Sequence, residues 1–82
     1  MSQADQIRKY VLDQIIEPAR RQSRSLVQVH AAEVHAAMKL ENRFPAVCSA
    51  LDADKFLGEA RVTLVRRSGP KHGSTAEWVF GL

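Results

Sequence analysis

The spacing of apolar residues changes character along this chain, and the order of these changes restricts the fold more than any other feature. From Ile7 to Ala19, apolar residues recur at intervals of three, four and one, as on one face of a helix. From Val62 onward they alternate with polar residues, as in half-buried strands. Helical and strand-like patterns that follow one another in one short chain predict an α+β fold.

The chain has 82 residues, enough for a single small domain, 1–82, with one core. This length excludes a barrel enzyme and a doubly wound nucleotide-binding fold. The net charge of +3 permits an anionic partner without requiring one. Cys48 is the single cysteine, so no intrachain disulfide forms, and we expect a buried thiol in a reducing, cytoplasmic protein. No apolar run is long enough to span a membrane, and no membrane partner is expected.

The predicted element order is helix, strand, helix, helix, strand, strand. The first helix begins near Ile7. Pro18 is expected to kink it, or to end it before a fresh turn through Arg21, because proline cannot donate to the carbonyl of Gln14. Alternation predicts a strand over 26–30, and an alanine-rich apolar face predicts a helix over 31–38.

A tight connection over 39–41 leads to the third helix, 42–51. Asn42 is predicted to cap its start, and Pro45 fits its first turn. This helix continues or restarts through 55–57, and Gly58 is predicted to stop it. Two strands follow, 62–67 and 75–80, separated by a long turn over 68–74 that contains two glycines and a proline.

The third helix has its apolar residues at the spacing of a single helical face. Phe44, Val47, Cys48 and Leu51 are therefore predicted to face the core. The outward face then comprises Arg43, Pro45, Ala46, Ser49 and Ala50. In the strands, Val62 and Leu64 are expected on one face, and Trp78 and Phe80 are expected to pack on the first and third helices.

This element order, with the helix pair around Lys39-Leu40-Glu41-Asn42, resembles the winged helix-turn-helix superfamily. The resemblance covers nearly the whole chain. It implies that the helix 42–51 enters the major groove and that the turn 68–74 is the wing. The implied function is sequence-dependent binding of double-stranded DNA by a small transcriptional regulator. A homodimer through the first helix, whose apolar arc is broad, is expected because one such module makes few contacts.

The residue types at these positions are suited to DNA. At the start of a recognition helix, Arg43 is suited to guanine and Asn42 to adenine. Lys71 at the wing and the arginines at its base are suited to phosphates, although alternation allows one of Arg66 and Arg67 at most to join a given surface. The predicted DNA-binding residues are Asn42, Arg43, Pro45, Ala46, Ser49, Arg66, Arg67, Lys71, His72 and Ser74.

The alternative function is a docking module within a larger protein complex, with no direct DNA contact. A charge of +3 is low for a DNA-binding protein, and Arg43 is the one charge in the first two turns of its helix, where it could equally be a solvated side chain. No enzymatic activity and no cofactor are expected, since the chain lacks a glycine-rich phosphate loop. No metal is expected either, because no zinc-ligand spacing relates His30, His35, Cys48 and His72.

Overall fold

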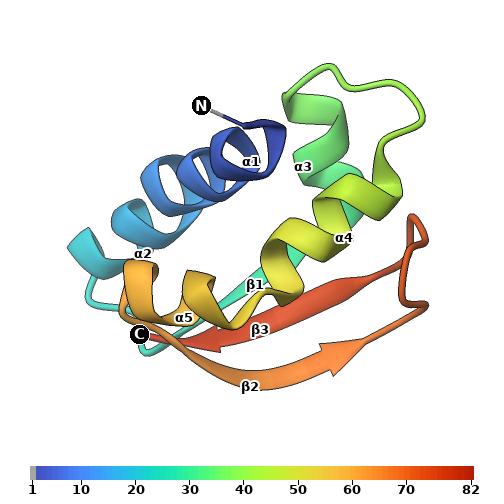
Figure 1. The fold of residues 1–82 in the computed structure, drawn as a ribbon. Helices are drawn as coiled ribbons and strands as arrows, with labels where there is room; N and C mark the ends of the chain where they lie inside the picture. The colour runs from blue at the N-terminus through green and yellow to red at the C-terminus, as the bar shows by residue number, and fades with distance from the viewer. Residues whose placement is uncertain (1) are drawn as a thin grey trace.

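The computed structural model describes residues 2–82, which form an α+β domain with the helices on one face of an antiparallel sheet (Figure 1). The expected fold class is confirmed at this level. The helical segments are α1 (Gln3–Val11), a π-helical turn (Leu12–Ile16), α2 (Glu17–Arg21), α3 (Ala31–Ala37), α4 (Phe44–Asp52) and α5 (Asp54–Ala60). The strands are β1 (Leu26–His30), β2 (Thr63–Ser68) and β3 (Glu77–Gly81).

α1, the π-helical turn and α2 follow one another without a gap and together form the first helical unit. Its last part, α2, begins beside Pro18 and ends at Arg21, in agreement with the predicted fresh turn through Arg21. The chain widens into a π-helical turn just before the proline, and the Glu17 N–H donates to the Leu12 carbonyl five residues back. A regular turn would place the proline ring against the Gln14 carbonyl. Widening the turn removes this clash and lets the helix continue.

The sheet has the strand order β1-β3-β2, with both neighbouring pairs antiparallel. Trp78 and Phe80 of β3 point toward the helices and are fully buried, so their predicted burial is confirmed. Phe80 contacts Phe56 of α5 edge-on, with ring centres 5.5 Å apart. The remaining core comes from every helical segment and from β1, whose Val27 and Val29 alternate with exposed residues.

Leu64 of β2 pairs with the buried Phe80 and so lies on the helix-facing side of the sheet, but burial along this segment is uneven. Val62 is buried, whereas Leu64 is 45% exposed and Val65 is 56% exposed. A β-bulge between Leu64 and Arg66 interrupts the pairing of β2 with β3, so strict alternation fails there. β2 is also an edge strand of the sheet, where little of the helical layer covers it (Figure 1).

The predicted restart of the third helix is confirmed, but its predicted stop at Gly58 is wrong. Ala53 is extended and separates α4 from α5, and Gly58 lies inside α5. The helix ends instead at Arg61, which adopts a left-handed conformation with φ 56°. The Val62 N–H then donates to the Leu57 carbonyl, which closes the helix end.

Candidate nucleic-acid interface

The turn between α3 and α4 positions the start of the candidate recognition helix. Asn42 does not cap this helix, contrary to the prediction, because it takes a left-handed conformation with φ 52° that forms the turn. Arg43 precedes the first helical residue, and its backbone N–H donates to His35 Nε2 of α3 at 3.2 Å. Phe44 stacks on the same imidazole, with ring centres 4.0 Å apart. His35 therefore fixes the start of α4 to α3.

The outer surface of α4 is narrower than the sequence predicts. Arg43, Pro45 and Ser49 are exposed, and Ala46 is half-buried. Ala50 is 1% exposed, so its predicted place on the outward face is wrong. It lies on the side of α4 that packs against α1, where its carbonyl accepts a hydrogen bond from Arg8.

The loop between β2 and β3 turns back beside α4 (Figure 1). Gly69 begins this turn with φ +85°, and a Cβ there would lie 2.5 Å from the Thr75 carbonyl oxygen. The loop then reaches the middle of α4, where the Cys48 Sγ lies 3.8 Å from the Gly73 carbonyl oxygen. We call residues 69–76 the wing loop. Three of its predicted site residues are exposed: Lys71, His72 and Ser74.

The outer residues of α4 and those of the wing loop thus lie on adjoining segments that contact each other. We call this region the α4–wing surface, and it comprises Asn42, Arg43, Pro45, Ala46, Ser49, Lys71, His72 and Ser74. Arg43 and Lys71 supply its fixed positive charges. Eight of the ten residues that the sequence singles out therefore lie on these two segments, and all of them except Ala46 are exposed.

Arg67 lies beside this surface, but its guanidinium group is already engaged. It forms a two-pronged ion pair with Asp52 at the end of α4, with Nε 2.9 Å from Oδ1 and Nη2 3.2 Å from Oδ2. The hydrogen bond to Asp52 raises the pKa of Arg67 above its usual range. The remaining donors point at backbone carbonyls of the wing loop and of Ser68. Arg67 therefore has a structural role, and it has no free pair of N–H donors that could bind a phosphate.

Arg66 lies on the opposite face of the sheet from α4. Its guanidinium pairs with Glu77, with Nη2 3.3 Å from Oε1. Ser68 and Arg66 together stabilise the charged carboxylate and hold the pKa of Glu77 below its usual value. The side chain is 65% exposed, and it lines a shallow groove with Leu26 and Val65 on the open sheet face. Arg66 is therefore separated from the α4–wing surface.

The cysteine and histidines do not form a reactive or metal-binding cluster within residues 2–82. The predicted burial of Cys48 is confirmed, and this burial raises the pKa of its thiol. No group of three potential metal ligands occurs in this part of the chain. None of the helices described here has the length and apolarity needed to cross a membrane.

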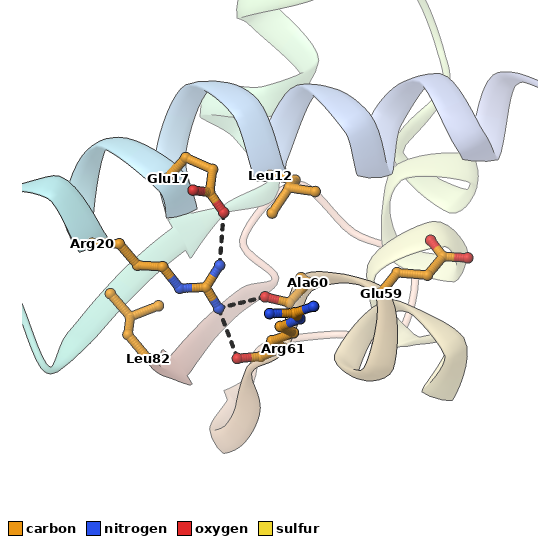
Figure 2. Close-up of a pocket in the computed structure, with 7 residues that line it drawn as sticks. All are labelled: Leu12, Glu17, Arg20, Glu59, Ala60, Arg61 and Leu82. Carbon is orange, nitrogen blue, oxygen red and sulfur yellow. Dashed lines mark hydrogen bonds and ion pairs between the residues drawn. The ribbon is translucent and has the colours of Figure 1, made fainter.

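A pocket of about 490 Å³ lies at the other end of the molecule, between the first helical unit and the end of α5 (Figure 2). Arg20 extends across it and donates to Glu17 at 2.7 Å and to the carbonyls of Ala60 and Arg61. These bonds join α2 to the C-terminal end of α5. Arg20, the central donor of the pocket, therefore makes its hydrogen bonds within the protein. For this reason the α4–wing surface is the stronger candidate site.

Sequence reasoning missed the two residues that organise this surface, His35 and Asp52. The Asp52 contacts join positions 15 and 26 residues apart, to Arg67 and to the indole of Trp78. No local spacing rule relates such positions. The one available signal is that Asp52 is the only charged residue within α4.

Comparison of the chain with models of known protein families, with curated proteins and with solved structures finds no match.

Proposed function

We propose that this chain is a winged helix-turn-helix module that binds double-stranded DNA through the α4–wing surface. The element order and the three-stranded antiparallel sheet are compatible with that superfamily. The observation that carries the proposal is the position of the wing loop, which lies against α4 and adds Lys71 to the surface that carries Arg43. Both cations are exposed, as contacts with one duplex would require.

The proposed mechanism divides base reading from backbone binding. The start of α4 enters the major groove, where Arg43 and Asn42 meet base edges. The small exposed residues Pro45 and Ser49 let the helix approach closely. Lys71, with the other exposed polar groups of the wing loop, binds phosphates and sets the orientation of the module. We assign this activity to a small cytoplasmic transcriptional regulator, because the free, buried Cys48 suits a reducing compartment.

A homodimer through the first helix is not part of this proposal. Ile7, Val11, Ile16 and Ala19 from its apolar arc are buried in the domain's own core. What remains for a second copy is a set of partly buried side chains, such as Leu12 and Ile15.

The proposal is tested by titrating a fluorescent duplex of mixed sequence, and a duplex selected for tight binding, at several salt concentrations. Arg43→Ala should cost about 1–3 kcal/mol on the selected duplex and flatten sequence preference at one position. Lys71→Ala should weaken both duplexes equally and reduce the slope of log affinity against log salt by about 0.9.

Arg66→Ala is the matched control for both variants, because it removes an exposed arginine from the opposite sheet face. It should leave affinity and salt slope close to those of the wild type. Equal effects of Arg66→Ala and Lys71→Ala would show a nonspecific charge effect and contradict the proposed surface.

Protein docking is the second candidate function, and one observation favours it. The open sheet face carries two large exposed apolar side chains, Leu26 at 47% and Val65 at 56%. If the wild type binds neither duplex at low salt, DNA binding is excluded and docking through this face becomes the leading function. Loss of partner binding on Val65→Ser, with the α4–wing surface unchanged, would then support it.

A further inference from the structure

The guanidinium of Arg67 joins α4, β3 and the wing loop at one point. On the helix side it pairs with both oxygens of Asp52. The same carboxylate accepts the indole N–H of Trp78 at 2.7 Å, and the guanidinium carbon lies 4.8 Å from the centre of the Trp78 ring. A fully buried residue of the central strand therefore holds this ion pair in place.

On the loop side, four successive carbonyl groups converge on the same cation. Nη1 lies 2.7 Å from the Ser68 oxygen and 3.4 Å from that of Gly69. Nη2 lies 3.1 Å from the Pro70 oxygen and 3.3 Å from that of Lys71. A guanidinium has five donors in a rigid planar fork, whereas an ammonium group is a compact point charge and cannot serve both sides in this way.

We propose that Arg67 is a positioning residue for DNA binding, which holds the wing loop beside α4 so that Lys71 meets the backbone of a duplex bound by α4. This inference rests on the proposed function. Arg67 itself makes no DNA contact in this role, since its side chain is 19% exposed and every guanidinium nitrogen has an acceptor within the protein. A wing loop that is ordered before binding loses less conformational entropy when the complex forms.

The first test replaces the planar guanidinium group with an ammonium group and keeps the positive charge. Arg67→Lys should accelerate hydrogen exchange at the Ala76 amide, which donates to the Gly73 carbonyl across the wing loop. It should also weaken duplex binding by about tenfold through the lost preorganisation. Arg66→Lys makes the same chemical change on the opposite face and should alter both quantities less than about twofold.

The second test asks whether Arg67 acts through Lys71. Lys71→Ala is measured on the mixed-sequence duplex in the wild-type background and in the Arg67→Lys background. A positioning role predicts coupled losses, so that Lys71→Ala costs at least about threefold less in the Arg67→Lys background. A purely global effect on folding predicts that the two losses multiply.

Asp52→Asn provides a second variant in case Arg67→Lys does not fold, because it removes the partner charge with little change in shape. The same coupling with Lys71→Ala is expected. Multiplying losses in these backgrounds, or wild-type affinity in Arg67→Lys, would overturn the positioning role while leaving the proposed function standing. Failure of the wild type to bind either duplex would overturn both.

Discussion

Three arginines of this protein serve the fold, which changes how its positive charge is distributed. Arg8 and Arg20 donate to backbone carbonyls 42 and 40 residues away along the chain, and Arg67 donates to those of the wing loop. Each joins the end of one element to another. With a net charge of only +3, the cations that remain exposed determine where a polyanion would bind. Arg43 and Lys71 belong to this exposed group.

Asp5, in the first turn of α1, gives the protein a defined sensitivity to acid. Its hydrogen bonds with Arg8 and Ser2 lower the pKa of Asp5 from 3.8 to about 2. Because the folded pKa lies below the unfolded value, the ionised carboxylate stabilises the native state above pH 3.8, and this contribution is lost as pH falls toward 2.

Asp5→Asn should therefore reduce the acid dependence of the denaturation midpoint across this pH range, measured by circular dichroism in urea. Asp54→Asn is the matched control, since Asp54 lies in the first turn of α5 as Asp5 does in α1 and is exposed. An unchanged acid profile in Asp5→Asn would contradict the assignment.

Trp78 is the single tryptophan and is fully buried. Trp78→Ala should destabilise the protein by about 3–5 kcal/mol, because it leaves a large cavity between β3 and the helices. Urea denaturation followed by circular dichroism measures this loss. In the wild type, Trp78 emission should be blue-shifted and resistant to quenching by iodide, and red-shifted emission would contradict its burial.

At the scale of elements, local patterns predict which helices and strands exist, and tertiary contacts decide how they end. Alternation identified β1 with its observed bounds, because Val27 and Val29 must both face one layer of helices. Asn42 was expected to cap a helix, yet the chain uses its tolerance of positive φ in the turn, and the backbone N–H of Arg43 donates to His35. That imidazole lies eight residues before Arg43, beyond any capping motif.

The candidate site shows the same difference between what local patterns predict and what tertiary contacts decide. Residue type and position along the predicted elements identified the exposed residues Arg43 and Lys71. Alternation correctly separated Arg66 from Arg67, but it did not show that Arg67 is fixed by Asp52 while Arg66 lies on the open sheet face. The difference arises from the partner that each side chain meets after folding.

Gly58 shows that a glycine can lie inside a helix without ending it. A Cβ at this position would meet nothing within 4 Å, and the residue lies in the exposed middle of α5. Gly58→Ala should stabilise the protein by about 0.4–1 kcal/mol, because alanine restricts the unfolded chain. Thermal unfolding measures the change.

Gly69→Ala is the contrasting variant, and it should destabilise the protein. Its φ of +85° is unfavourable for alanine, and the added methyl group would lie 2.5 Å from a backbone oxygen. Stabilisation by Gly69→Ala, or destabilisation by Gly58→Ala, would contradict these backbone assignments.

At the scale of the whole molecule, the dimensions are those of one compact chain. The Cα radius of gyration is 11.6 Å, close to the value of about 12 Å expected for a compact domain of this length. Because the apolar arc of the first helical unit is used by the core, small-angle scattering of the free protein should give the mass and radius of a monomer. A doubled mass that persists on dilution would contradict this expectation.

The π-helical turn has a consequence for how this protein tolerates changes in chain length. It contains one residue more than a regular turn, so in effect it is a single-residue insertion accommodated within a helix. In a regular helix, the spacing of five residues would set Val11 and Ile16, both fully buried, about 140° apart on the helix surface, and the wider turn brings them closer to one face. Deleting one of the exposed residues Asp13 or Gln14 should therefore convert the wide turn into a regular one and keep the segment after it in phase with α1. The strain would then fall on Pro18, whose ring would meet the carbonyl four residues before it.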